Sequence, residues 1–344
     1  MDQAGPPRLG VFLPTFCDEG GRSGRDIAAF ARRAEELGFH SLWATDHLLH
    51  GSLFYRVAWL DPLLALTYAA CATTNVRLGT SILVMPTRHP VLLAKEIATL
   101  QALSGDRFVL GAGTGWDRRE FDAMGIARSE RGSRTDEAIA IVRRLLSGEG
   151  SSYEGTSISF GDVVIGPRPA RPLQVWVAGG QQLARPESPE PARLAPAVLE
   201  RIVAAEGWIA RPTATPEQIA ADRGRIVERL HMLGRDPKQF VFAHENFLHL
   251  VPTDDPREAR AEQRRAFVAF MGDGRPFEYF DAVYLTGTPA EIVEKISRRV
   301  DAGISSLLLH TLEPSTRQLD LWIEHIVPEL PFELAPVVRS RQPP

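Results

Sequence analysis

The sequence has 344 residues, a net charge of −4 and a charged share of 24%, without the basic excess that attracts nucleic acid or anionic lipid. Its only cysteines, Cys17 and Cys71, are far apart and lack metal-ligand spacing, which excludes a disulfide framework and predicts no bound metal. No run approaches the roughly 18 apolar residues that a spanning helix needs. We therefore expect a cytoplasmic protein without a nucleic-acid or membrane partner.

Strand and helix patterns alternate along the first half of the chain. A buried strand is expected over residues 9–13, and the helical spacing of apolar residues over 25–37 ends at Gly38. Asp61 with Pro62, and Pro90 by itself, are typical helix starts. Three further units are predicted, with strands at 41–44, 76–84 and 107–111, and helices at 61–73, 91–103 and 130–146.

The second half continues the alternation after an interruption. Frequent Gly, Ser and Pro over residues 148–172 indicate an inserted hairpin, and a Pro-rich loop is expected over 183–196. The remaining strands are predicted at 174–178, 207–210, 239–251 and 305–310, and the helices at 192–205, 216–233, 256–271, 288–303 and 316–327. We treat residues 1–344 as a single domain.

About eight strands alternating with helices favour a closed parallel barrel, the TIM (β/α)8 barrel. A doubly wound open sheet is the alternative. That fold expects a Gly-x-Gly-x-x-Gly turn after its first strand, which residues 9–17 lack. Glycines recur at 111, 113 and 115 after the fourth expected strand, but Trp116 stands where the third glycine of the motif would be needed. No dinucleotide-binding fingerprint is therefore present.

In such a barrel the active site forms from the loops that follow each strand. Asp46 and His47 follow the second strand, and a histidine beside a carboxylate at that position can transfer a proton near neutral pH. The alternative is a pair of polar turn residues without catalytic function.

Five segments of the chain match known motifs at strand ends. They are 43–47 (Trp-Ala-Thr-Asp-His), 78–90 (Leu-Gly-Thr-Ser-Ile-Leu-Val-Met-Pro-Thr-Arg-His-Pro), 113–121 (Gly-Thr-Gly-Trp-Asp-Arg-Arg-Glu-Phe) with 130–137, 175–180 (Val-Trp-Val-Ala-Gly-Gly) and 206–209 (Glu-Gly-Trp-Ile). In this order they resemble motifs of the bacterial luciferase-like monooxygenase family. The segment 113–121 with 130–137 is most similar to an actinobacterial subgroup usually assigned as dependent on the deazaflavin coenzyme F420. The resemblance covers roughly residues 9–330 and implies a TIM barrel and a flavin-type oxidoreductase.

The resemblance also implies roles for individual residues. A cis peptide between Ser81 and Ile82 would lie under the central ring of the cofactor. Asp46 would lie beside the cofactor, and His47 would act in proton transfer or hold the reduced flavin. Other positions implied to bind the cofactor are Gly113, Thr114, Gly115, Arg134, Gly179, Gly180 and Gln181.

Elementary chemistry supports part of this assignment. Small residues at 113 and 115 let backbone approach a planar ring, and Arg131 and Arg134 lie at a helix start that favours an anion. Arg131 fits a solvated helix face equally well. The Gly179-Gly180 pair suits a phosphate. The Pro-rich loop that follows departs from the family pattern and puts the contact of Gln181 in doubt.

Substrate preference is indicated by one departure from the family. Its sugar-phosphate dehydrogenase branch has an acidic base where Trp116 stands here, which disfavours glucose phosphate as the substrate. Trp116 with Phe16 and Trp59 would line a pocket for a small apolar or planar substrate. The alternative is that these aromatics cover the barrel mouth or a dimer contact.

Hydride transfer with coenzyme F420 is the first functional hypothesis. The second is oxygen insertion by reduced FMN (FMNH2), supplied by a separate reductase, and a third is a non-catalytic flavin-binding protein. Family resemblance also implies a homodimer, and the helices at 61–73 and 91–103 carry more apolar residues than one barrel-facing stripe requires. The loop 45–60 or the N-terminal arm would be the alternative cover for that surface.

Overall fold

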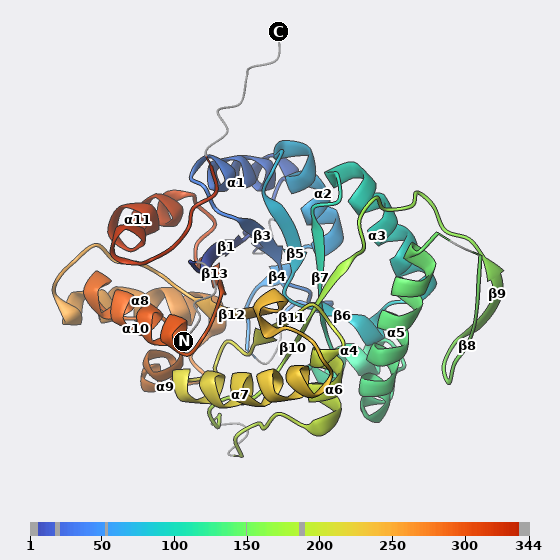
Figure 1. Cartoon of the computed structure of the whole chain (residues 1–344). Helices are drawn as coiled ribbons and strands as arrows, with labels where there is room; N and C mark the ends of the chain where they lie inside the picture. The colour runs from blue at the N-terminus through green and yellow to red at the C-terminus, as the bar shows by residue number, and fades with distance from the viewer. Residues whose placement is uncertain (1–5, 18–20, 52–53, 149, 186–189, 337–344) are drawn as a thin grey trace, which may run out of the picture.

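In the computed structural model, eight parallel strands close into a barrel around which the helices lie (Figure 1). β10 pairs with both β7 and β11, and β13 pairs with β1, so the ring has no open end. The closed ring confirms the predicted TIM barrel, and the doubly wound alternative is wrong. The structure describes residues 6–17, 21–51, 54–148, 150–185 and 190–336. In order around the barrel the strands are β1 (Arg8–Phe12), β3 (Ser41–Ala44), β5 (Arg77–Thr80), β7 (Phe108–Gly113), β10 (Gln174–Gly179), β11 (Gly207–Ala210), β12 (Val241–Phe247) and β13 (Ser306–His310).

Several helices begin at side chains that cap them. Asp61 accepts hydrogen bonds from the amides of Leu63 and Leu64, and Thr215 and Thr288 each form a capping box. Within the described residues, no helix is both long and apolar enough to cross a membrane. The helices are α1 (Gly24–Glu36), α2 (Pro62–Ala72), α3 (Pro90–Ser104), α4 (Arg118–Ala123), α5 (Arg131–Leu146), α6 (Pro196–Val203), α7 (Pro216–Met232), α8 (Pro256–Met271), α9 (Phe277–Val283), α10 (Pro289–Asp301) and α11 (Arg317–His325).

The expected strand over 76–84 is interrupted at the barrel mouth. β5 ends at Thr80, the peptide bond between Ser81 and Ile82 is cis, and β6 (Leu83–Val84) then pairs with the end of β7. The cis bond agrees with the family resemblance. The break turns the backbone of residues 81 and 82 out of the ladder at the end of the barrel where the strands finish.

Several predicted boundaries were wrong. The strand expected over 239–251 stops at Phe247, because Leu248 bridges to Leu285 and the amide of Leu250 bonds to Gln318. The helix expected from 192 starts at Pro196, and α4 and α9 were not predicted. The predicted loop 45–60 contains β4 (Ala58–Trp59), which pairs antiparallel with β2 (Phe16–Cys17). This short sheet brings Phe16 and Trp59 together.

The hairpin of the 148–172 segment consists of β8 (Ser151–Glu154) and β9 (Ser159–Val163). It projects beside α5 at the outside of the barrel (Figure 1).

The barrel interior is filled mainly by large side chains. Trp43 and Trp176 are buried with ring centroids 5.1 Å apart, and Phe12, Val109, Ile209 and Leu308 pack around them. A Cβ atom at Gly79 would lie only 2.4 Å from the Trp43 ring, so glycine is required there for the indole to fit. The interior is thus a packed core and not a pore.

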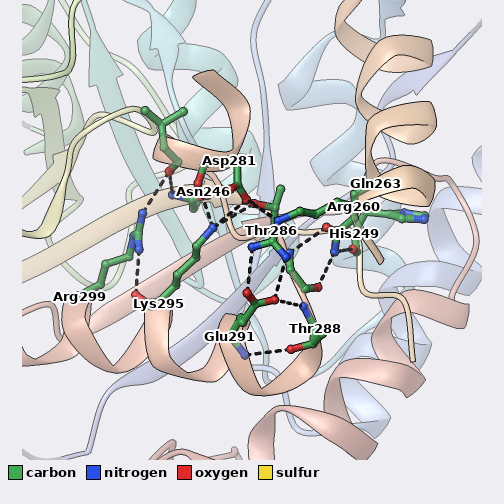
Figure 2. A network of polar contacts seen from close by, with 12 residues as sticks. Asn246, His249, Arg260, Gln263, Asp281, Thr286, Thr288, Glu291, Lys295 and Arg299 are labelled. Atoms are coloured by element: carbon green, nitrogen blue, oxygen red, sulfur yellow. Dashed lines mark hydrogen bonds and ion pairs between the residues drawn. The ribbon is translucent and has the colours of Figure 1, made fainter. Parts of the chain in front are cut away.

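A buried polar network fixes α8, α9 and α10 beside β12 (Figure 2). The Gln263 amide donates to the carbonyls of His249 and Gly287, and its oxygen accepts from the Gly287 amide. Arg260 forms two hydrogen bonds with Glu291, and Lys295 donates to Asp281. These bonds hold α8, α9 and α10 together beside β12.

Candidate active site

His47 lies in the loop after β3, at the barrel mouth, and is held by a glutamate of α4. Its Nδ1 atom is 3.1 Å from Oε1 of Glu120, which also accepts the Leu48 amide at 3.0 Å. The Glu120 side chain is only 2% exposed. Sequence reasoning missed Glu120, although Asp117, the N-cap of α4, was a local signal for the helix that carries it. The carboxylate of Glu120 orients the imidazole, whose side chain is only 6% exposed.

Aromatic rings surround the His47 imidazole. Its ring centroid lies 5.3 Å from that of Tyr55, 5.6 Å from Trp59 and 5.5 Å from Trp116. Phe16 contacts Trp59 at 6.1 Å. The structure therefore brings Phe16, Trp59 and Trp116, the three predicted pocket residues, together beside the predicted catalytic histidine.

A second carboxylate–imidazole pair lies across the mouth. The Ser81 hydroxyl donates to Glu245 Oε2 at 2.7 Å, and Glu245 Oε1 is 2.9 Å from His310 Nε2. The His310 ring is stacked between Phe12 and Phe247. Burial lowers the pKa of His310, against the opposing effect of Glu245. Glu245 was missed because it lies inside a long, mostly apolar strand.

Asp46 is buried and holds the backbone that follows the cis bond. Its carboxylate accepts the Val84 amide at 2.9 Å and the Arg88 guanidinium at 3.0 Å, and Arg88 also donates to Asp61. Burial raises the pKa of the Asp46 carboxyl, and Arg88 opposes that shift. Asp46 thus ties β3 to β6 at the predicted ring site.

The small residues after β7 are required by their neighbours. A Cβ atom at Gly113 would lie 2.4 Å from Ile82 Cδ1, and one at Gly115 would lie 2.7 Å from Val84. Gly115 also has a φ of +68°, in the left-handed region that favours glycine. Gly113, Thr114 and Gly115 therefore lie beside the segment that includes Ser81 and Ile82.

Arg134 lies apart from these residues. Its Nε atom donates to Glu130 at 2.8 Å, one turn earlier on the helix. It borders a small space together with Met85 and with Ser157 of the hairpin segment. The structure does not bring Arg134 to His47.

The turn after β10 is occupied by a carboxylate from α7. Asp222, 1% exposed, accepts the Gln181 backbone amide at 2.6 Å and the Gln181 side-chain amide at 2.9 Å. Its Oδ2 atom would be 2.7 Å from a Cβ atom at Gly180. Gly179 accepts a hydrogen bond from Trp208. A phosphate bonded to the Gln181 amide does not fit this arrangement, because the amide is engaged and the carboxylate would repel it.

A metal site is not indicated. The described residues contain no group of three or more His, Cys, Asp or Glu side chains that could hold a metal ion.

Comparison with known proteins places these features in a wider group. A family model described as "Luciferase-like monooxygenase" matches residues 8–278. An F420-dependent glucose-6-phosphate dehydrogenase of Beutenbergia cavernae is 29% identical over 89% of the chain and 93% of its own length. An F420-dependent hydroxymycolic acid dehydrogenase of Mycobacterium tuberculosis is 28% identical over 88% of the chain and 84% of its own. The crystal structure of monooxygenase RslO1 from Streptomyces bottropensis, 25% identical, superposes with a TM-score of 0.76 over 93% of the chain and 99% of its own.

Burial of His310 predicts a pH dependence of stability. Its pKa lies below 6.5 in the folded state and at about 6.5 in the unfolded chain, so the unfolded state takes up the proton first as pH falls. The free energy of unfolding should fall below pH 6.5 by up to about 1.4 kcal/mol per pH unit from this group. Urea unfolding of wild type and His310→Gln, referenced to pH 8, should show a shallower decline in the variant. An equal decline in both proteins would contradict the assignment.

Proposed function

We propose, since the chain belongs to the luciferase-like monooxygenase family, that it is an oxidoreductase that uses coenzyme F420. The observation that carries the proposal is the position of His47, oriented by Glu120, within an aromatic mouth that also contains the Ser81–Ile82 segment. Relatives named as F420-dependent dehydrogenases match most of the chain, which supports the choice of cofactor.

The residues of the mouth fit a planar ring. Ser81, Ile82 and Gly113 would hold the deazaflavin, since a side chain at 113 would displace Ile82. Bound F420 supplies hydride exchange at its ring. His47 would hold or deliver the proton that accompanies that exchange, at the oxygen or nitrogen of the substrate, and Glu120 would keep the imidazole in one orientation.

The aromatic groups around His47 support a substrate class. Trp59, Trp116 and Tyr55 present apolar ring surface to the imidazole. A small apolar or planar organic molecule would bury its surface there and exclude water from the proton transfer.

Oxygen insertion with reduced FMN is the second candidate. It is favoured by the similarity to monooxygenase RslO1. In that case a separate reductase would be a partner. The described residues form one candidate site, at the barrel mouth, and that site would receive FMN that is already reduced.

Anaerobic titration of the purified protein tests this proposal. F420 should bind at micromolar concentration, and FMN should bind more weakly. His47→Ala should keep the F420 affinity within a few fold and reduce turnover, followed by deazaflavin absorbance, by about 10² to 10⁴. Micromolar FMN binding without F420 binding would reverse the cofactor order, and near-normal turnover in His47→Ala would remove His47 from the mechanism.

A homodimer is the proposed assembly, formed through α2 and α3. Leu64, Tyr68 and Leu92 are 69%, 57% and 59% exposed, while Leu66 and Leu93 on the same helices are buried in the core. The two helices lie side by side on the outside of the barrel (Figure 1). The described part of the 45–60 loop leaves these side chains open to solvent. A second copy would cover them.

Light scattering at micromolar concentration should give twice the mass of one chain. The double variant Leu64→Glu and Leu92→Glu should give the mass of one chain, because two buried charges in the contact are unfavourable. Met232→Glu, at a residue 70% exposed on α7, is the matched control and should remain dimeric. A wild-type protein that stays monomeric on concentration would refute the dimer.

A further inference from the structure

Three arginines lie on segments that follow neighbouring strands, close to the turn after β10 that Asp222 contacts. Gly179 pairs with Ala210, so the next residues, Gly180 and Arg211, leave adjacent strands at the same level. On the other side of β10, Arg131 donates to the Gly115 carbonyl at 3.4 Å. Arg131, Arg211 and Arg185 of the loop after β10 therefore converge from three successive units of the barrel.

Arg185 is held in place by a short chain of hydrogen bonds. It donates to the Gln182 side-chain oxygen at 2.7 Å, and that oxygen also accepts the Thr213 hydroxyl at 2.9 Å. Its guanidinium carbon lies 5.0 Å from the centre of the Phe54 ring, which is 4.5 Å from the Trp116 ring. The arginine group is thereby connected to the aromatic mouth at His47.

The three cations are not balanced by the one acid among them. Nε of Arg185 and Nε of Arg211 are buried and have no hydrogen-bond partner among the residues that the structure describes. Burial, with the charges of Arg185 and Arg131, lowers the pKa of Arg211 to about 10, against the opposing effect of Asp222. Buried Nε–H groups without an acceptor are costly, and an anion placed between these guanidinium groups would relieve that cost.

We propose that Arg131, Arg185 and Arg211 bind the phosphate group of the ring cofactor, in place of the backbone amides of the turn after β10. The inference rests on the proposed function and assigns the anionic part of that cofactor. Asp222 secures Gln181 and so leaves the arginines as the donors. F420 and FMN share this chemistry, since each joins its ring through a ribityl chain to a phosphate.

Binding measurements on Arg211→Gln test the assignment. The probes are F420, FMN and the deazaflavin riboside, which has the same ring as F420 but no phosphate. Arg211→Gln should weaken F420 binding about 10- to 100-fold, the range for loss of a hydrogen bond to a charged group. It should leave riboside binding within twofold. Whichever of F420 and FMN binds wild type and loses affinity in the variant is the source of the phosphate.

Arg229→Gln is the matched control, because Arg229 is on α7 but pairs with the exposed Glu200. It should bind both probes as wild type does. Arg185→Gln provides a second variant if Arg211→Gln fails to fold, with the same expected loss. Wild-type affinity for the phosphate-bearing cofactor in both arginine variants would overturn the inference. A loss of riboside affinity equal to the loss of cofactor affinity would also overturn it. Either result would leave the proposed function standing. Failure of wild type to bind either cofactor would instead overturn the proposed function.

Discussion

The pairing of β7 with β10 closes the barrel, and the geometry of the mouth depends on it. The register places Val177 beside Ala112, and Gly179 beside Ala210 on the other edge of β10. Loops that are far apart in the sequence therefore meet at one end of the molecule. Without the closed ring, the loop with His47 and the turn after β10 would have no fixed separation.

Buried carboxylates organise each part of this mouth. Glu120 orients His47, Glu245 joins Ser81 to His310, and Asp222 secures Gln181. The three acids come from α4, α7 and β12, and each holds a group that lies on another element of the barrel. The side chains are fixed before any ligand arrives, which lowers the ordering cost of binding and reaction.

Local sequence patterns predicted most of the scaffold. β3 and α8 have the predicted bounds, because a buried strand and a capped amphipathic helix each have a clear period. His47 was identifiable because a strand end is recognisable, and the cis bond at Ser81 because a family motif covers it. The strand predicted over 239–251 was too long. Its last residues have other partners, since Leu250 bonds to Gln318 of α11 and Leu248 bridges to Leu285.

The carboxylate partners could not be predicted by the same reasoning. Glu120 is 73 residues from His47 along the chain, and Asp222 lies 41 residues from Gln181, within a helix whose pattern looks ordinary. Such pairs depend on three-dimensional packing, which periodicity does not encode. The sequence predicted that Phe16, Trp59 and Trp116 share a pocket, but not how they are arranged. Two of them are aligned by the pairing of β2 with β4, which no local sequence pattern indicated.

The central claim is that ring and substrate meet between the Ser81–Ile82 segment and His47. A crystal structure of the protein soaked anaerobically with F420 tests it most directly. The account predicts deazaflavin density against the Ser81–Ile82 peptide, with its open face toward His47 and Trp116. Density for the ring outside the barrel mouth, or stacked with its reactive face turned away from His47, would contradict it.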